Sequence, residues 1–313
     1  WGEKYLPTEN MEYGIVTDSI AREAGLRNGD KIISVDGENI ENFSDILPHV
    51  LLNKTSTIKV KRDGKIATVD LPKNLVRDII QSESYFINVA FPFVVEDFTD
   101  DSNSKEAGLQ KGDRIVGINN QKLPYFSQYA PVLDEYKGEE VILRVERHGD
   151  IIDVPVTVNN DGMIGVRVKS VNDFFDFRVK KYSLISAIPA GINKGYNEIK
   201  NYLKQLRLIF NPETEAYKSL GGFIAIGNIF PASWDWYSFW MMTALLSIML
   251  GILNILPIPA LDGGHVMFLM YEIIVGRKPS DKFLEYAQIT GMVLLLALVV
   301  YANGNDIVKL FNS

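Results

Sequence analysis

The sequence of 313 residues contains no cysteine, only three histidines and no excess of positive charge. Without cysteine the chain can form neither a disulfide nor a thiolate metal site. The absence does not fix the cellular compartment, because many exported proteins also lack cysteine. The formal net charge of −7 argues against nucleic acid as a partner, because proteins that bind nucleic acid present a basic face to the phosphates. The sequence also has no cluster of Lys and Arg interleaved with aromatic residues, which would favour nucleic-acid binding.

The beginning of the sequence lacks a methionine, a signal peptide and a leading apolar helix. It starts with Trp1. We therefore expect a processed, trimmed or partial product of a longer protein. The length predicts two or three domains.

Charge is also absent from two long segments of the second half. Residues 236–256 hold no charged side chain over 21 positions, which is long enough to span a hydrocarbon core of about 30 Å. Residues 287–303 hold none over 17 positions, at the short end of that range. We expect two transmembrane helices, with buried core helices as the alternative. An aromatic group like an interfacial belt marks the start of the first segment: Trp234, Trp236, Tyr237 and Trp240.

The first half contains an internal repeat. The stretch EAGLRNGDKIISVDG, residues 23–37, returns as EAGLQKGDRIVGINN, residues 106–120, at an offset of 83. FSDILPHVL and FSQYAPVL align at the same offset, and VKRDG and VERHG align at an offset of 85. The sequence therefore contains two copies of a unit of roughly 80 residues.

Each copy predicts a small β-rich α+β unit. The glycines of A-G-L-x-x-G-D suit tight turns with positive φ, and the following Asp30 or Asp113 suits an Asx-type turn into a strand. KIISV and RIVGI are typical of short strands, and RDG and RHG are typical of hairpin turns. Ser44 and Ser127 are candidate N-caps of a helix with apolar residues at helical spacing.

Two such units resemble PDZ domains of the bacterial protease type, with boundaries at 1–86 and 87–168. PDZ domains bind an extended peptide, which adds to a sheet edge beside a carboxylate-binding loop. A structural spacer with a closed groove is the alternative for each copy. In the second copy the usual loop glycine is absent. The resemblance places the candidate peptide-binding residues at Gly14, Ile15 and Val16 in the first copy, and at Phe93, Val94 and Val95 in the second.

Residues 169–235 form the next predicted region. Apolar residues recur at helical spacing between Ile192 and Phe210, with lysines and an arginine between them, so we expect an amphipathic helix at a membrane surface or packed on its own protein. The Gly-rich SLGGFIAIG, residues 219–227, is too short to span and is either a re-entrant segment or a loop.

Residues 236–313 form the last predicted region, with the two membrane spans. Arg277, Lys278 and Lys282 lie in the connection between the spans. The positive-inside rule places that connection in the cytoplasm and the repeats on the periplasmic or extracytoplasmic side.

The stretch NILPIPALDGGH at the end of the first span holds the candidate site. A carboxylate at membrane depth indicates function. The two prolines remove backbone donors, so neighbouring carbonyls are free to meet an extended peptide, and the glycines after Asp262 permit close backbone approach. An N-cap role for Asp262 at the water interface is the alternative, and it does not exclude a metal role.

The pattern N-x-x-P-x-P-x-L-D-G resembles the third-ligand motif of the site-2 proteases, which are intramembrane zinc metalloproteases. Tandem PDZ domains before it resemble the RseP-type branch, which cleaves anti-sigma factors and clears remnant signal peptides. The resemblance implies that Asp262 is a carboxylate ligand of catalytic Zn²⁺. It implies that Asn254, Pro257 and Pro259 hold the substrate extended, and it implies no metal role for His265. It also implies a multi-pass protein of the bacterial inner (plasma) membrane.

The family's other two ligands and its general base lie in an H-E-x-x-H helix upstream of the PDZ region. The three histidines of this chain, His49, His148 and His265, are not in such a motif, and Phe223 replaces the usual proline after SLGG. We therefore expect the C-terminal part of a zinc metalloendopeptidase that cleaves single-span substrates, with PDZ domains that gate access. The alternatives are a membrane-anchored PDZ scaffold or pseudoprotease that binds peptide termini, and a regulatory adaptor in which Asp262 only caps a helix.

Overall fold

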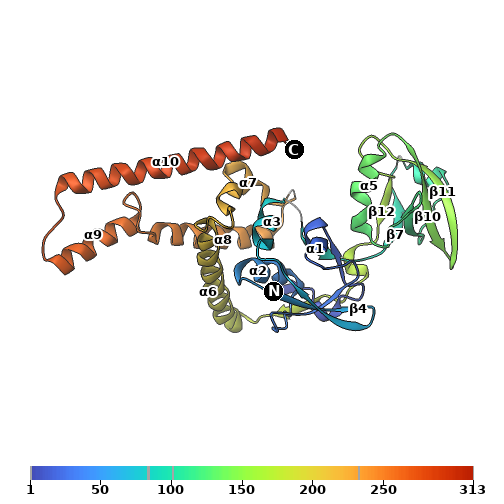
Figure 1. Cartoon of the computed structure of the whole chain (residues 1–313), viewed down its shortest axis with the longest axis horizontal. Helices are drawn as coiled ribbons and strands as arrows, with labels where there is room; N and C mark the ends of the chain where they lie inside the picture. Colours follow the sequence, from blue (N-terminus) through green and yellow to red (C-terminus); the bar gives the residue numbers. More distant parts are fainter. Residues whose placement is uncertain (1, 83–84, 101, 232, 313) are drawn as a thin grey trace. The chain divides into compact units, whose positions relative to one another are not determined.

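The chain divides into a β-rich unit and a helical unit (Figure 1). The computed structural model describes residues 2–82, 85–100, 102–231 and 233–312. The boundary between the units falls between Lys181 and Tyr182. At this level the expected order, β-rich domains and then a helical region, is confirmed.

The first repeat folds into what we call the first lobe. An antiparallel sheet in the order β3-β4-β5 and a separate β2-β6 pair enclose its core. Ile46 and Val50 of α2 are buried in that core beside Val35 and Ile58, as the helical spacing of the apolar residues predicts. The elements are β1 (Gly2–Tyr5), β2 (Ile15–Thr17), α1 (Ser19–Glu23), β3 (Lys31–Val35), α2 (Ile46–Leu52), β4 (Thr57–Arg62), β5 (Lys65–Asp70), α3 (Leu75–Gln81) and β6 (Ile87–Val89).

The second repeat forms the second lobe with a corresponding sequence of elements. Its strands lie in the order β11-β10-β8-β7-β12, with β9 paired to β8. Tyr129 of α5 is buried against Phe93, with ring centroids 4.9 Å apart. The elements are β7 (Phe93–Phe98), α4 (Asn103–Glu106), β8 (Arg114–Ile118), β9 (Gln121–Lys122), α5 (Tyr129–Glu135), β10 (Glu140–Arg147), β11 (Asp150–Thr157) and β12 (Val166–Val168).

The first lobe also includes chain from beyond both repeats. β13 (Arg178–Lys181) pairs with β1, and Phe175 is buried in the first core together with Ile87. The first lobe therefore extends past residue 86 and takes in residues 171–181, which the boundaries drawn from the repeat place in the third region. Residues 171–181 belong to the first lobe because the phenylalanines of the stretch FFDF pack in the first core and not in the helical unit.

The prediction that Ser44 and Ser127 cap the helices is wrong. Each serine lies inside a short 3₁₀ turn, Phe43–Asp45 or Phe126–Gln128, which leads directly into α2 or α5. The side chain of Asn42 caps the first turn and accepts a hydrogen bond from the backbone N–H of Ser44 at 3.2 Å. The turn moves the start of the helix by a few residues, a shift that the repeated serine does not reveal.

An ion pair between a buried carboxylate and a partly exposed arginine joins the two halves of each repeat. Arg62 donates from Nε and Nη2 to the two oxygens of Asp30 at 2.8 and 2.7 Å, and Arg147 does the same to Asp113 at 2.7 and 2.6 Å. The Asp30 carboxylate also accepts the N–H of Arg27, three residues before it, so the expected forward Asx-type turn is wrong. The matching arginines of VKRDG and VERHG were the available sequence signal for this pair.

Replacement of Arg147 by Met should destabilise the second lobe by about 3–5 kcal/mol at neutral pH, because it leaves a buried carboxylate without its cation. Burial alone would raise the pKa of Asp113, but the hydrogen bonds from Arg147 and from the N–H of Gln110 outweigh it and hold that pKa below its usual value. The pair therefore stabilises the lobe above about pH 4 and loses that contribution as the pH falls through the lowered pKa.

The measurement is hydrogen exchange of the β8 amides at pH 7 and at pH 4, corrected for intrinsic rates. The loss of protection against exchange that Arg147→Met causes should be smaller at pH 4, because the Asp113 carboxyl, left without its cation, can take up a proton there. Arg144→Met is the matched control, since the Arg144 side chain is half exposed and only 3.8 Å from Asp153. Equal losses of protection in the two variants would contradict the conclusion that the Arg147–Asp113 pair stabilises the second lobe.

The second unit consists of helices. α8 and α10 are long and apolar enough to cross a membrane, and both are largely exposed within the described chain. The two predicted spans are therefore helices, although α10 begins six residues before the uncharged segment. The elements are α6 (Leu184–Ile209), α7 (Phe223–Asn228), α8 (Trp236–Ile255), α9 (Asp262–Val275) and α10 (Asp281–Asn312).

The amphipathic helix α6 starts earlier than the periodicity predicts. Ser183 and Ser186 form a reciprocal cap, in which the N–H of Ser183 donates to Ser186 Oγ at 2.8 Å and the N–H of Ser186 donates to Ser183 Oγ at 3.2 Å. This cap fixes the start of the helix at Leu184. The additional turns carry exposed apolar residues, with Ile185 at 84% and Ile188 at 67% exposure.

Candidate active site

The motif around Asp262 forms a break between two helices. α8 ends at Ile255, residues 256–261 form an irregular turn, and α9 begins at Asp262. The turn is closed by two backbone hydrogen bonds, from the N–H of Ile258 to Leu256 O at 2.7 Å and from the N–H of Leu261 to Ile258 O at 2.8 Å. The broken backbone that the two prolines predict is confirmed.

Two glycines allow this turn to fold tightly onto α9. A Cβ on Gly263 would meet the carbonyl oxygens of Ile255 and Leu256, and a Cβ on Gly264 would lie 2.5 Å from Pro259 Cα. Both glycines are buried. The close backbone approach expected of them is confirmed, and the partner is the chain's own turn.

A third glycine brings α10 against the same turn. A Cβ on Gly291, in the middle of α10, would lie 2.8 Å from the backbone N of Ala260. The turn is therefore held between the first turn of α9 and the side of α10. This packing fixes the backbone on which Asp262 stands.

Asp262 is the first residue of α9 and is exposed. Leu261 occupies the cap position, so the alternative in which Asp262 is the N-cap is wrong by one residue. A carboxylate in the first helical turn is favoured by the helix dipole. Its oxygens form no hydrogen bond or ion pair with another described residue, which leaves them available to a ligand.

The described residues contain no group of three His, Asp or Glu side chains that could hold a metal ion. A catalytic zinc takes three protein ligands and keeps one position for water or substrate. Asp262 fits as one oxygen donor of such a set, and the other ligands would have to come from outside the described chain. His265 follows three residues later in α9 and is also exposed, whereas His49 and His148 belong to the β-rich unit.

The other predicted substrate-contacting residues lie on the same short stretch of chain. Asn254 is half-buried in the last turn of α8, Pro257 is exposed in the turn, and Pro259 is half-buried beside α9. All three precede Asp262 by three to eight residues in the sequence, Asn254 in α8 and the two prolines in the turn. Their contact with a substrate stays a prediction.

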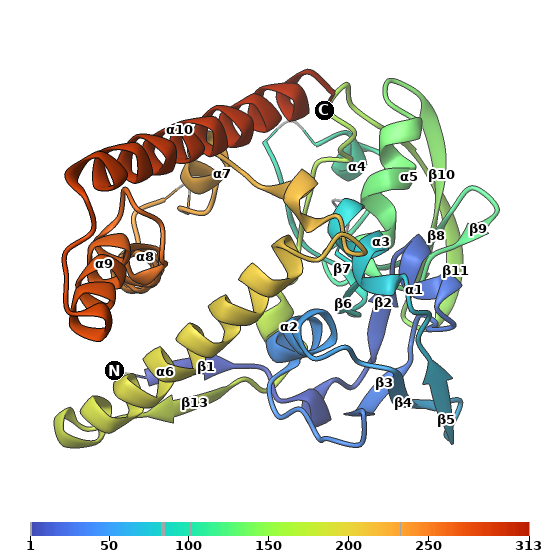
Figure 2. The same cartoon turned by 60° about the vertical axis from the view of Figure 1, so that its left-hand side comes forward.

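The SLGG segment is bound to the C-terminal part of α10, which the sequence did not predict. Figure 2 shows α7 beside α10, and Asp306 accepts the N–H groups of Ile224 and Ala225 at 3.0 and 3.1 Å. Asn303 Oδ1 accepts the N–H of Phe223 at 3.2 Å. These bonds satisfy the free N–H groups at the start of α7, so the segment is a capped short helix rather than a loop.

Replacement of Asp306 by Ala should loosen α7. The N–H groups of Ile224 and Ala225 lose a charged acceptor, which corresponds to about a tenfold or greater rise in their hydrogen exchange. Asp235→Ala is the control, because Asp235 caps α8 through the N–H of Ser238 at 2.7 Å and should affect only that helix. Unchanged exchange in α7 of the Asp306 variant would show that Asp306 does not hold it.

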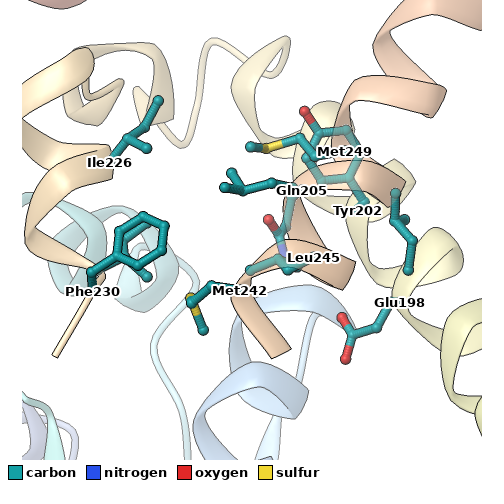
Figure 3. A pocket seen from close by; sticks show the side chains of 11 residues that line it. Glu198, Tyr202, Gln205, Ile226, Phe230, Met242, Leu245 and Met249 are labelled. Carbon is teal, nitrogen blue, oxygen red and sulfur yellow. The ribbon is translucent and has the colours of Figure 1, made fainter. Parts of the chain in front are cut away.

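A groove of about 400 Å³ lies between α6, α7 and α8. Ile226 of α7 and Phe230, two residues past the end of α7, face Gln205, Met242 and Leu245 across it (Figure 3). None of the motif residues 254–263 is among those that line it. The groove is therefore separate from the candidate metal ligand.

In the first lobe the candidate peptide-binding strand is already paired on both edges. One edge of β2 pairs with β6, and on the other edge Ile15 exchanges backbone hydrogen bonds with Gly29 and Asp30 at 2.8 and 2.9 Å. The side chains of Ile15 and Val16 are buried. Gly14 has φ +73°, and a Cβ there would lie 2.5 Å from Asp30 O, so only glycine fits this loop.

The second lobe repeats this arrangement. β7 pairs with β12 on one edge, and on the other edge Val95 exchanges backbone hydrogen bonds with Gly112 and Asp113 at 2.8 and 2.9 Å. Phe93 and Val95 are buried, and Val94 O accepts the N–H of Lys169 at 3.0 Å. In either lobe, an added peptide strand would have to displace one of the chain's own strands.

Comparison with known proteins places the chain in a family. The profile of peptidase family M50 matches residues 35–298, and the profile of the PDZ domain matches residues 13–50. The PDZ match covers part of the first repeat. The M50 match covers most of the chain, including the motif around Asp262.

Relatives that are named as proteases share sequence similarity with the chain. The zinc metalloprotease RasP of Shouchella clausii is 30% identical over 68% of this chain and 51% of its own length. The regulator of sigma-E protease RseP is 29% identical in Salmonella typhimurium and 26% identical in Escherichia coli, over 95% of this chain and 70% of each relative. The chain thus spans about half of the first relative and more of the other two. With the M50 profile matched from residue 35 to residue 298, the chain belongs to peptidase family M50, the site-2 proteases.

Proposed function

We propose that the chain is the C-terminal part of an intramembrane zinc metalloprotease, in which Asp262 provides a carboxylate ligand of the zinc. The observation that carries the proposal is the exposed Asp262 at the start of α9, beside a proline-broken turn, between two helices long enough to cross a membrane. Irregular backbone at membrane depth is tolerated inside protein or beside a water-filled cavity, as a protease site in a membrane requires.

The residues of this chain would supply one ligand of the zinc ion and would hold the substrate in extended form. A zinc ion bound in such a site supplies the Lewis acidity that makes water nucleophilic at neutral pH. The amide of Asn254 and the carbonyls of the turn at Pro257 and Pro259 would hydrogen-bond a substrate in extended form. An H-E-x-x-H helix from outside residues 1–313 would supply the two imidazoles and the general base.

The two lobes would act as tandem PDZ domains that limit which substrates reach the membrane site. The repeated element order and the repeated Asp–Arg pair support a second PDZ domain, although the PDZ profile matches only the first copy. The paired edges of β2 and β7 favour a size filter over capture of peptide termini. Peptide addition at Gly14 or Val94 would first require β6 or β12 to leave.

The substrates would be single-span membrane proteins such as anti-sigma factors, or remnant signal peptides. The protein would lie in the bacterial inner membrane with α6 along the membrane surface, where its exposed apolar stripe would be buried. The basic residues after α9, Arg277 and Lys278, would face the cytoplasm, and the lobes the opposite side.

The test is cleavage of a single-span reporter by the full-length protein in proteoliposomes. We expect cleavage within the membrane segment, its loss with the chelator 1,10-phenanthroline, and its recovery when zinc is restored. A protein that retains zinc and fold but cleaves none of several single-span reporters would favour the non-catalytic scaffold.

A further inference from the structure

The outer face of the first lobe's β3-β4-β5 sheet carries an uncompensated positive charge. Side chains alternate across a strand, so Ile32, Ile58 and Val60 point into the core while their neighbours point outward. β3, β4 and β5 lie side by side in Figure 2. We call the outward residues the lysine face: Lys31, Ile33, Lys59, Lys61 and Ile66, all of them exposed.

The lysine face costs stability in the isolated chain. Lys31 and Lys61 are direct cross-strand partners, a like-charge pair that weakens a sheet. Among the described residues, none forms an ion pair with Lys31, Lys59 or Lys61. Asp70, at the end of β5 opposite Thr57, is a carboxylate at the border of this face.

In the corresponding sheet of the second lobe, the basic side chains of the outer face form ion pairs with acidic side chains. Arg114 occupies the position of Lys31, and its Nη1 lies 3.5 Å from Oε2 of Glu146 on the neighbouring strand. Arg144 Nε lies 3.8 Å from Oδ1 of Asp153. In the offset of 85 that aligns the two hairpins, Glu146 and Asp153 correspond to Lys61 and Thr68 of the first lobe. The acids that neutralise the second sheet are therefore absent from the first.

We propose that the lysine face binds the anionic headgroups of a lipid bilayer. Lysines with apolar side chains between them are typical of surfaces that lie at a membrane interface, and Ile33 and Ile66 are 38% and 72% exposed among these lysines. The lysine stems can cover apolar surface while their ammonium groups reach the phosphates. An acidic peptide would complement the charge but gives no reason for the exposed isoleucines.

The membrane helices make lipid the nearest anionic surface available. This inference rests on the membrane placement proposed above: with α8 and α10 in a bilayer, contact of the lobe with headgroups would be an intramolecular event with a high effective concentration. Each lysine near an anionic surface multiplies the docked population by about five, so the three lysines together contribute about a hundredfold. The second lobe, with paired charges, should show little such preference.

Residues 1–313 contain no cysteine, so a single cysteine introduced among them can be labelled there. Ile66→Cys, labelled with bimane, would report access of the neutral quencher acrylamide in nanodiscs of phosphatidylcholine, with and without phosphatidylglycerol. Ile151→Cys is the matched control, because Ile151 occupies the corresponding exposed position of the second lobe. The proposal predicts that phosphatidylglycerol shields the label at position 66 but not at position 151.

A charge reversal completes the test. Lys31→Glu combined with Lys61→Glu should return the quenching at position 66 to its value in phosphatidylcholine, and high salt should do the same to the unmodified face. Equal quenching in both lipids would overturn the proposal. Shielding by a polyglutamate peptide but not by phosphatidylglycerol would also overturn it and assign the face to an acidic protein segment. None of these outcomes depends on proteolytic activity.

Discussion

Replacement of Asp262 by Asn should abolish proteolysis by the full-length protein, with a fall in rate of about a thousandfold or more. Asn keeps the size and the helix-start position of the side chain but removes the negative charge through which the proposed zinc ligand would act. A metal site contributes several kcal/mol to the transition state, and each 1.36 kcal/mol is a factor of ten in rate. The measurement is the rate of reporter cleavage in proteoliposomes.

Asp281→Asn provides the control for this variant. Asp281 is also an exposed acid at the first position of a helix, α10, and its loss removes the same helix-dipole interaction without a metal role. It should leave the cleavage rate within about twofold, since a helix-dipole interaction at an exposed position is worth about 0.3–1 kcal/mol of stability. Full activity of the Asp262 variant would show that this carboxylate is only part of a helix start.

Replacement of Gly263 by Ala should produce the second large effect. The new Cβ would overlap the backbone carbonyls of Ile255 and Leu256, which cannot move as a side chain can. Overpacking of this kind costs about 1–3 kcal/mol. The turn must shift away from α9, and Asp262, next to the substituted residue, must move with it. We expect a lower unfolding temperature and at least a tenfold loss of cleavage rate, because small displacements of reacting groups are costly.

Gly251→Ala is the matched control for the Gly263 variant. Gly251 lies within α8, and a Cβ there meets nothing within 4 Å. The alanine should stabilise the helix by up to about 1 kcal/mol. Equal unfolding temperatures for the two variants would contradict the close contact between the turn and α9.

The features that the sequence predicted correctly depend on local patterns. The duplicated A-G-L-x-x-G-D, the apolar spacing of α2 and the uncharged segments of α8 and α10 each lie within a short window, where periodicity and turn chemistry decide the structure. The prolines and glycines around Asp262 likewise act on neighbouring backbone. The break at this position was therefore predictable without any knowledge of distant contacts.

The features that the sequence did not predict depend on contacts between distant residues. Arg62 binds Asp30 from a strand 32 residues away, and Asp306 caps α7 from more than 80 residues away. The return of Phe175 to the first core and the pairing of β6 with β2 are of the same kind. A single sequence contains the residues for these contacts but not the pairing between them.

The most direct test of the central claim is the zinc content of the purified full-length protein, with and without Asp262→Ala. The account predicts about one zinc ion per chain in the unmodified protein, and weakened or lost zinc in the variant. A zinc content that is the same in both proteins, or an unmodified protein without zinc, would contradict the assignment of Asp262 as a metal ligand.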